Sequence, residues 1–393
     1  MQLSPPRNPT LMLPVANPPM HKLECLPQVF LRNGGTLDAL KEMYAIGHRR
    51  GVEFPHLVSL KYSQIDSPLG DPTVQQCRGL ILDEKDNWRI VARPFDKFFN
   101  WGELNAAKID WETALCQEKL DGSLIILYWY AGDWRVATSG IPDAMGEVGP
   151  TGAEQDITFK QLFWRTWDQL GYIKPAMCWQ NWTFLFELMT PYNRVVCRYP
   201  KPRIVFLGCR GADAEGEELS PDEFAWQSYK WAAVREFPLR TMAHIQATFV
   251  AMDPLTQEGY VIVDSDYHRI KVKHPGYVAL HHMRGDGYGP RRVLEVILSG
   301  ESYEVIGNFP EWRDDFDSMT HKLAELIAHL EDAYMRLGGI PLQKAFALEA
   351  LKTRCPAALF CLRKGKFQSV QEFLRQMSPD TLLIILQTPW TSQ

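Results

Sequence analysis

Residue types that could act together on a nucleotide fall within one short segment, Glu118–Ser123. Lys119 lies two positions before Asp121 and three before Gly122, directly ahead of a predicted strand at 124–130. A lysine held in this way can attack the α-phosphate of a nucleotide and keep the nucleoside monophosphate as a phosphoramide. The segment is therefore a candidate site of covalent nucleotidyl transfer.

The amine needs help from its surroundings before it becomes a good nucleophile. A free lysine has a pKa near ~10.4, so few such side chains are neutral at pH 7. Desolvation, a metal ion or neighbouring cations around the phosphates would supply that help. Asp121 could contact the ribose or place the lysine, and Gly122 could let backbone approach the nucleotide. The same string is also typical of a turn that opens a hairpin, so the motif needs further support.

Five other segments place charged residues in or beside apolar strands. They are residues 77–83, 93–100, 184–188, 258–261 and 271–273. The candidate functional residues within them are Arg78, Lys97, Glu187, Glu258, Lys271 and Lys273.

Strand alternation gives two of these segments a distinctive geometry. Glu187 stands between Phe186 and Leu188, so its carboxylate points to the face opposite both. Lys271 and Lys273 alternate with apolar residues, which puts both ammonium groups on one strand face. A buried carboxylate needs a metal or a cation as partner, and two like charges on one face suit an anion.

Each of these residues also has a simpler interpretation. Arg78 could be an edge residue that reaches solvent, and Lys97 could lie at a loop surface before its aromatic neighbours. The face that carries Lys271 and Lys273 could be a solvated strand face. The argument for a shared site therefore depends on the segments occurring together.

Taken in order, these segments resemble the nucleotidyltransferase motifs of polynucleotide ligases. The closest likeness is to the phage-type RNA ligase 1 family, ATP-dependent enzymes that seal RNA ends. Three details favour that family over DNA ligases and capping enzymes: the arginine-glycine strand before 97–100, the run at 191–196, and the long tail after Lys273. The resemblance covers roughly residues 55 to 320.

The resemblance implies a role for each charged residue. Lys119 would be the adenylated nucleophile, and Lys271 and Lys273 would grip the α-phosphate. Glu187 and Glu258 would serve the ribose or the divalent metal.

The remaining positions follow from the same resemblance. Arg78 and Lys97 would lie near the phosphates and the RNA ends. Val261 would pack on one face of the adenine, and a residue of the strand 204–208 would pack on the other. The predicted ATP site is completed by Glu118, Asp121 and Gly122.

Charge is local rather than global in this chain. A net charge of −5 argues against a protein that coats nucleic acid regardless of sequence, since such a protein would be basic throughout. Two basic runs, at 194–210 and 268–292, could contact phosphates, and Arg194 of the first is a predicted RNA contact. A charge run is also typical of a solvated face, so either interpretation stays open.

The cysteines indicate neither a zinc site nor a disulfide framework. Eight cysteines occur at irregular spacings, and none forms a C-x-x-C pair. Reduced thiols favour a cytoplasmic or nucleoplasmic protein. No stretch approaches ~18 apolar residues, and the proline-rich start has no signal-peptide pattern, so we expect a soluble, non-secreted protein without a membrane partner.

The chain divides into three predicted parts. Residues 1–21 are rich in proline and are expected to form a mobile arm. Residues 22–278 are expected to form an α+β domain of antiparallel sheets with inserted helices, which the resemblance identifies as a nucleotidyltransferase domain. Residues 279–393 are expected to be all-helical, because apolar residues recur at helical spacing from 316 to 337.

Several elements can be placed within these parts. We expect helices at about 37–49, 158–170, 341–352, 367–376 and 379–387, the last capped by Ser378 with Pro379 in its first turn. We expect strands at 57–62, 80–83, 182–188, 203–208, 259–264 and 269–273. Gly285, Gly287 and Gly289 indicate a flexible loop rather than a phosphate cradle.

The resemblance implies an ATP-dependent ligase that joins 5′-phosphate and 3′-hydroxyl RNA ends through lysyl-AMP, with Mg²⁺ or Mn²⁺ as the metal. Its RNA could be a broken tRNA, and a separate kinase-phosphatase could heal the ends first. Two alternatives stay open. One is another nucleotidyltransferase, a DNA ligase or a GTP-using capping enzyme. The other is a non-catalytic RNA-binding or tRNA-scaffolding protein that kept the fold.

Overall fold

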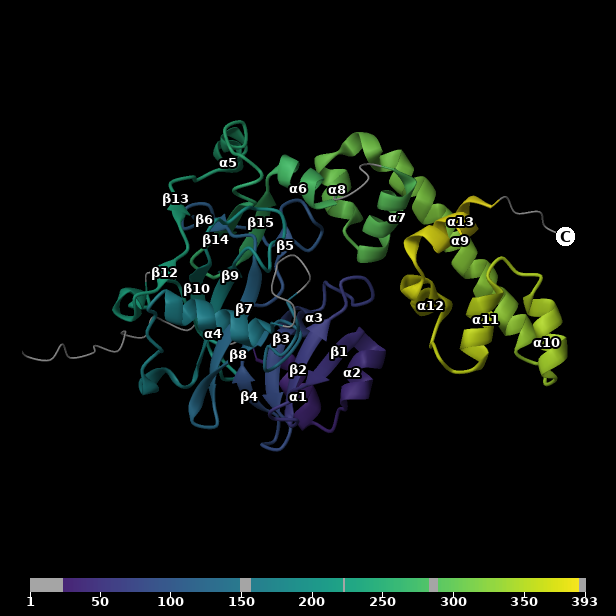
Figure 1. Ribbon diagram of the computed structural model, residues 1–393, viewed down its shortest axis with the longest axis horizontal. Helices are drawn as coiled ribbons and strands as arrows, with labels where there is room; N and C mark the ends of the chain where they lie inside the picture. The colour runs from purple at the N-terminus through teal and green to yellow at the C-terminus, as the bar shows by residue number, and fades with distance from the viewer. Residues whose placement is uncertain (1–23, 149–156, 222, 283–288, 389–393) are drawn as a thin grey trace, which may run out of the picture.

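Three mainly antiparallel sheets are followed by a run of helices, which gives the α+β class that the sequence predicts (Figure 1). The structure is a computed structural model that describes residues 24–148, 157–221, 223–282 and 289–388. The predicted arm at 1–21 and the glycines Gly285 and Gly287 lie outside these residues.

The first sheet has four strands in the order β1-β2-β3-β4. They are β1 (Ile46–Arg50), β2 (Leu57–Tyr62), β3 (Arg78–Asp83) and β4 (Arg89–Ala92). Three helices pack on the face that carries the alternating residues Val58, Leu60, Leu80 and Leu82. These helices are α1 (Leu26–Arg32), α2 (Leu37–Tyr44) and α3 (Pro72–Gln76).

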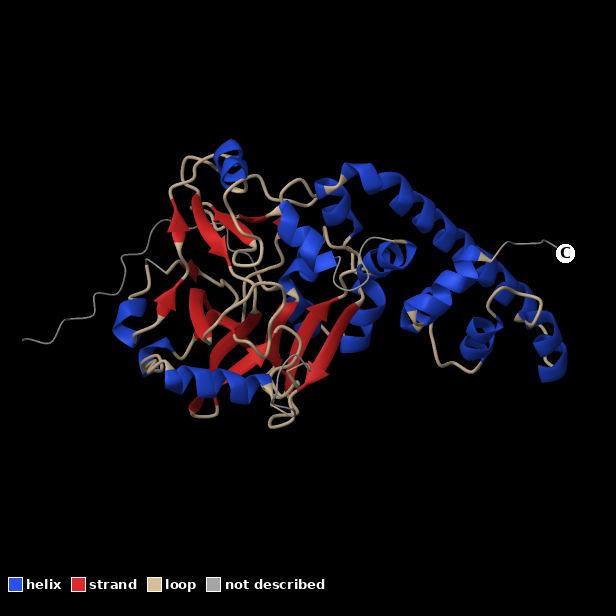
Figure 2. Ribbon diagram, turned by 45° about the horizontal axis from the view of Figure 1, so that its top comes forward, coloured by secondary structure: helices blue, strands red, loops and turns tan. Residues whose placement is uncertain are grey.

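The second sheet has six strands in the order β11-β10-β9-β7-β8, with β12 beside β10. They are β7 (Ser123–Tyr130), β8 (Asp133–Thr138), β9 (Trp182–Met189), β10 (Arg203–Gly211), β11 (Glu218–Leu219) and β12 (Ala232–Ala233). The helix α4 (Phe159–Gln169) lies across this sheet (Figures 1 and 2). It buries Phe163 and Trp167 against Phe184 and Phe186 of β9. Thr158 caps it with a capping box, so the helix predicted at 158–170 is confirmed.

The third sheet has five strands in the order β13-β6-β14-β15-β5. They are β5 (Phe99–Asn100), β6 (Leu115–Lys119), β13 (Glu236–Phe237), β14 (Gly259–Val263) and β15 (Arg269–Lys273). One face packs on the helix α5 (Met242–Thr248) through Ile245 and the strand residues Cys116, Ile262, Ile270 and Val272. Because strand side chains alternate, Lys119, Lys271 and Lys273 lie on the other face.

Helices make up the rest of the described chain and lie to one side of the sheets (Figure 2). They are α6 (Pro275–His282), α7 (Pro290–Ser299), α8 (Ser302–Asn308), α9 (Arg313–Leu337), α10 (Gln343–Ala350), α11 (Pro356–Arg363), α12 (Val370–Gln376) and α13 (Pro379–Gln387). Short 3₁₀ turns occur at Met177–Trp179, Trp226–Tyr229 and Pro310–Trp312. Ser378 caps α13 by accepting a hydrogen bond from Thr381 N, as predicted. None of the helices described is both long and apolar enough to cross a membrane.

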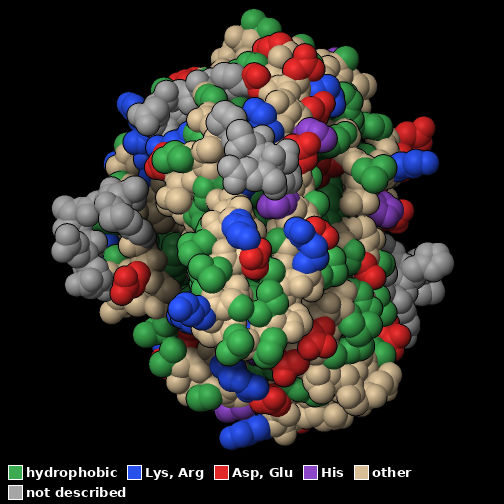
Figure 3. Space-filling model, turned by 90° about the vertical axis from the view of Figure 1, so that its right-hand side faces the viewer, with side chains coloured by type: hydrophobic (Ala, Val, Ile, Leu, Met, Phe, Trp, Pro, Cys, Tyr) green, Lys and Arg blue, Asp and Glu red, His purple; other side chains and the backbone are tan. Residues whose placement is uncertain are grey.

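The described surface on the C-terminal side is mixed in charge. Seen from this side, Lys and Arg side chains are dispersed among acidic and hydrophobic ones (Figure 3). All eight cysteines are free thiols, and most of them are buried.

One predicted helix is wrong at its end. The sequence predicts a helix at 37–49, but α2 ends at Tyr44, and β1 starts at Ile46. Ala45 adopts a left-handed conformation (φ 52°) that stops the helix. Ile46 is fully buried and pairs with Tyr62, so sheet pairing overrides local helical periodicity. Among the described helices, those without a predicted counterpart are α1, α3, α5, α6, α7, α8 and α11.

Leu185 lies between the first two sheets, on the β9 face opposite Phe184 and Phe186. We expect Leu185→Ala to lower the free energy of unfolding by about 2–5 kcal/mol, because its side chain is 0% exposed and the cavity would not refill. Leu104→Ala is the matched control, since Leu104 is 94% exposed. Chemical denaturation measures both changes, and equal effects would contradict this packing.

Candidate active site

Three adjacent strands place two lysines around one carboxylate. Gly259 of β14 pairs with Lys119 of β6 on one side and with Lys273 of β15 on the other. Glu258, the residue before Gly259, is 3% exposed and forms ion pairs with the ammonium groups of Lys119 and Lys273. Its Oε2 lies 2.7 Å from Lys119 Nζ, and its Oε1 lies 3.7 Å from Lys273 Nζ.

Gly259 makes this close arrangement possible. Its φ is +151°, and a Cβ at this position would lie 2.2 Å from Val272 O. Any other residue would therefore push β14 and β15 apart. The two lysines would then no longer share Glu258.

A third lysine, Lys271, lies on the same face and meets no acidic partner among the described residues. Its Nζ is 5.1 Å from the centre of the Phe98 ring, and Arg78 approaches that ring at 5.4 Å. Burial, followed by repulsion from Lys273 and Lys119, lowers the pKa of Lys271 well below its ordinary value. An anion bound beside Lys271 would offset this repulsion and favour its charged form.

Lys97 is a further cation near Lys271, because its charge also lowers the pKa of Lys271. It is buried, with its Nζ 4.7 Å from the Tyr62 ring and 4.9 Å from the Phe99 ring. It also donates to Gln64 Oε1 at 3.2 Å. The interpretation of Lys97 as a residue at a loop surface is therefore wrong.

Glu187 faces this cluster from the second sheet. Its pKa is raised to about 7, mainly by burial, while Lys119 and Arg78 act to lower it and Glu258 acts to raise it. The backbone N–H of Gly122 donates to it. A Cβ on Gly122 would lie 2.4 Å from Leu188 O, so this glycine permits close contact with β9.

Asp121 acts as an anchor inside the protein. It is 4% exposed, and its Oδ2 accepts hydrogen bonds from Val196 N at 2.7 Å and Cys197 N at 2.6 Å. Its Oδ1 accepts a hydrogen bond from Tyr277 OH at 2.7 Å. Because both oxygens are engaged, the geometry favours the placing role predicted for Asp121 over the ribose contact.

Three other predicted residues differ in how they lie relative to the lysines. Alternation puts Glu118 on the face of β6 opposite Lys119, and burial raises its pKa. Val261 pairs with Gln117 and Lys271, so it lies on the face of the lysines. Arg194 is exposed and donates to Val196 O at 3.2 Å, with no described contact to the cluster.

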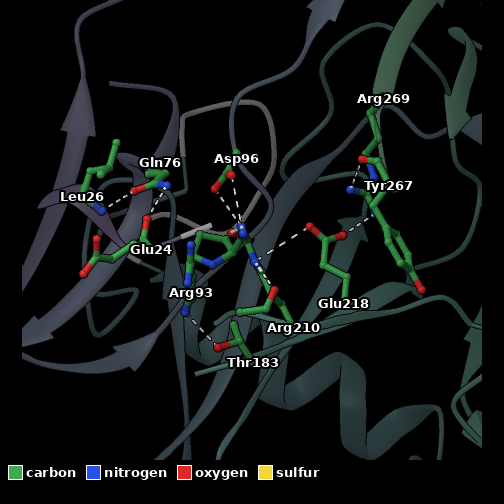
Figure 4. A network of polar contacts seen from close by, with 12 residues as sticks. Glu24, Leu26, Gln76, Arg93, Asp96, Thr183, Arg210, Glu218, Tyr267 and Arg269 are labelled. Atoms are coloured by element: carbon green, nitrogen blue, oxygen red, sulfur yellow. Dashed lines mark hydrogen bonds and ion pairs between the residues drawn. The ribbon is translucent and has the colours of Figure 1, made fainter. Parts of the chain in front are cut away.

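A buried network of arginines supports the segment before Lys97 (Figure 4). Arg210 donates to Asp96 Oδ1 at 2.7 Å and to Pro94 O at 3.0 Å. Arg269, which is on β15 with the lysines, pairs with Glu218 at 2.7 Å and lies 3.9 Å from the Phe95 ring. The network therefore fixes the 94–96 segment relative to β15.

Sequence reasoning missed two contacts to the site from the helices. They are Tyr277 of α6, which contacts Asp121, and Glu304 of α8, whose Oε1 lies 2.8 Å from Lys273 Nζ. Both are far from their partners in sequence, and no local pattern pointed to them.

The carboxylates present suit a divalent cation only in part. Among the residues described, no group of three or more His, Cys, Asp or Glu side chains could hold a metal. Glu187 and Glu258 lie close enough for the charge of Glu258 to raise the pKa of Glu187. One or two carboxylates completed by substrate phosphates are a common magnesium site, so this pair fits a metal that arrives with a nucleotide.

Comparisons with known proteins show which family the chain belongs to. A family model described as RNA ligase matches residues 76–277, about half of the chain. An RNA ligase of Rhodothermus phage RM378 is 26% identical over 373 residues, covering 75% of this chain and 82% of that protein. RNA ligase 1 of Bacteriophage TS2126 is 27% identical over 209 residues, covering 49% of this chain and 48% of that protein.

Two further matches are partial. A putative bifunctional polynucleotide kinase/RNA ligase of Autographa californica nuclear polyhedrosis virus is 28% identical over 302 residues. The match covers 71% of this chain and 41% of that protein. An archaeal ATP-dependent RNA ligase structure aligns at 16% identity with a TM-score of 0.45, covering 74% of this chain and 77% of that one.

The raised pKa of Glu187 has a consequence for stability. The folded pKa of about 7 lies above the ordinary 4.5, so between these values the folded state holds a proton that the unfolded state has released. The stability that Glu187 contributes is therefore complete below pH 4.5 and is lost as pH rises through about 7, by at most about 3 kcal/mol.

We expect metal-free wild type to lose more stability between about pH 5 and about pH 8 than Glu187→Gln, because only wild type must bury a charge there. Chemical denaturation at both pH values measures this difference. Glu112→Gln, which changes an exposed carboxylate, should behave like wild type. If Glu187→Gln lost as much stability between these pH values as wild type, the raised pKa of Glu187 would be refuted.

Proposed function

The chain belongs to the phage-type family of ATP-dependent RNA ligases, and we propose that it joins RNA ends through AMP carried on Lys119. The observation that carries this proposal is the shared carboxylate. Lys119 and Lys273 lie 2.7 Å and 3.7 Å from Glu258, in a buried site that also holds Lys271. A structural ion pair would need one lysine, whereas polyphosphate transfer needs several.

The first step charges the enzyme. The neutral Nζ of Lys119 attacks the α-phosphorus of ATP, the bond to the β-phosphate oxygen breaks, and pyrophosphate leaves. The lysine loses its proton and keeps AMP as a phosphoramide. Lys271 and Lys273 hold the α-phosphate oxygens as charge develops on them. The second sheet presents Glu187 to the same space.

The next two steps use RNA. The 5′-phosphate of one RNA end displaces Lys119 from AMP, which forms an adenylated RNA end. The 3′-hydroxyl of another end then attacks the 5′-phosphorus, closes the phosphodiester and releases AMP. Arg78 and Lys97 are the proposed contacts to the phosphates of the RNA ends, and Arg194 is a proposed outer RNA contact.

Magnesium is the proposed metal, with manganese as an alternative. Glu187 and Glu258 would hold it together with the nucleotide phosphates. A divalent cation there would neutralise phosphate charge and draw Glu258 away from the Lys119 ammonium. Val261 would pack on the adenine, and Asp121 would keep the segment of Lys119 in place.

For the biological substrate, we propose a class of RNA rather than one particular molecule. RNA or tRNA repair in the cytoplasm or nucleoplasm fits the family and the free thiols. A relative is named as a bifunctional kinase and ligase, which supports a proposal that a separate kinase-phosphatase prepares the ends for this chain. The helices after about residue 278 would form the domain that selects the RNA.

Replacing the nucleophile gives the direct test. We expect Lys119→Ala to abolish the acid-labile adduct formed with α-labelled ATP, while the circular dichroism spectrum stays like that of wild type. Lys108→Ala, which changes an exposed lysine of the same region, should label normally. Labelling of Lys119→Ala at the wild-type level would show that another residue carries AMP.

Substrate comparison separates the remaining alternatives. We expect adduct formation with ATP rather than GTP, and sealing of cleaved tRNAs or linear RNAs with 5′-phosphate and 3′-hydroxyl ends. Nicked DNA is the control substrate, and preferential sealing of it would favour a DNA ligase. If no adenylate forms with either magnesium or manganese, a non-catalytic RNA-binding role becomes the better explanation.

A further inference from the structure

A carboxylate from the helical region reaches into the lysine cluster. Glu304 of α8 is 8% exposed, and its Oε1 lies 2.8 Å from Lys273 Nζ. Glu258 lies farther from the same ammonium group, at 3.7 Å. Glu304 is therefore the nearer acidic neighbour of a lysine proposed to grip the α-phosphate.

The surroundings of Glu304 hold it against the sheets. Tyr303 donates a hydrogen bond to Gly102 O, directly after β5. Gly300 lies against Gln64, where an added Cβ would be 3.2 Å from Gln64 O. Figure 1 shows α6 and α8 beside the sheet that carries β15 and β5.

A more distant contact strengthens this docking. Arg375 of α12 forms an ion pair with Asp66, in the loop after β2. Gln64 of the same loop accepts a hydrogen bond from Lys97. The helices thus contact the sheet region at Lys273, at Gly102 and in the loop that holds Gln64 and Asp66.

We propose that Glu304 occupies the α-phosphate position on Lys273, so that nucleotide binding and docking of α8 compete with each other. This inference rests on the proposed function, because it takes Lys273 as a phosphate ligand. A carboxylate and a phosphate oxygen accept the same ammonium hydrogens, and two anions that converge on one lysine repel each other. A polyphosphate that binds Lys273 therefore displaces Glu304.

Nucleotide binding and docking of α8 would weaken each other. If docking of α8 weakens nucleotide binding by some factor, nucleotide weakens docking by the same factor. An empty site would keep the helices against the catalytic region, and a filled site would release them. Release of α8 uncovers the phosphate-binding face at the stage when RNA must enter.

Nucleotide affinity tests the proposal directly. We expect Glu304→Gln to bind α,β-methylene-ATP about tenfold more tightly than wild type by calorimetry, because the substitution keeps the shape but removes the competing charge. This probe cannot transfer AMP to Lys119, so binding is measured alone. Glu311→Gln, which changes an exposed carboxylate at Pro310–Trp312, is the matched control and should bind like wild type.

Hydrogen exchange tests the reverse direction. In wild type, α,β-methylene-ATP should speed exchange of the amides of 302–308, and in Glu304→Gln these amides should exchange quickly without nucleotide. Equal or weaker nucleotide binding by Glu304→Gln, or protection of α8 by nucleotide, would overturn the proposal. Adduct formation with α-labelled ATP distinguishes failure of the proposed competition from failure of the proposed ligase function. Normal labelling with unchanged affinity refutes only the competition, whereas no labelling by wild type refutes the proposed function.

Discussion

The geometry of the site depends on one buried carboxylate shared by two ammonium groups. Glu258 can meet both Lys119 and Lys273 because its neighbour Gly259 lets β14 approach β15 closely, while β14 pairs with β6 on its other side. Burying a carboxylate without such partners would be costly, so the pairing also stabilises the sheet. Formation of the third sheet therefore also brings Glu258, Lys119 and Lys273 together.

A second constraint keeps the nucleophile segment in register. Lys119 ends a strand of the third sheet, and Ser123 begins a strand of the second. The turn between them is fixed by Asp121, which accepts two backbone N–H groups and the hydroxyl of Tyr277. Since Tyr277 belongs to α6, the first C-terminal helix is bonded to the turn that positions Lys119.

Local pattern predicted much of the fold and the face on which each charge lies. Alternation in β9 and β15 predicted the directions of Glu187 and the lysine pair, helical spacing of apolar residues predicted α4, and capping chemistry supported α13. Pattern failed where a distant strand decides the outcome, as at Ile46, which pairs with Tyr62 instead of extending α2. It also could not reveal Tyr277 or Glu304, because their partners are more than a hundred residues away or in another layer.

The charge balance of the cluster explains why its partners come from three different layers. Arg78, Lys97, Lys119, Lys271 and Lys273 converge on a small volume, and such like charges repel strongly once water is reduced. The acidic residues around them are Glu258 from the same sheet, Glu187 from the second sheet and Glu304 from the helices. Glu187 is easily protonated near neutral pH, which leaves the site with an excess of positive charge. An excess of this sign is stable only while an anion compensates it, and a polyphosphate supplies more negative charge than any single side chain. The empty site therefore relies on the helices for part of its compensation, and this dependence ties the helices to the state of the site.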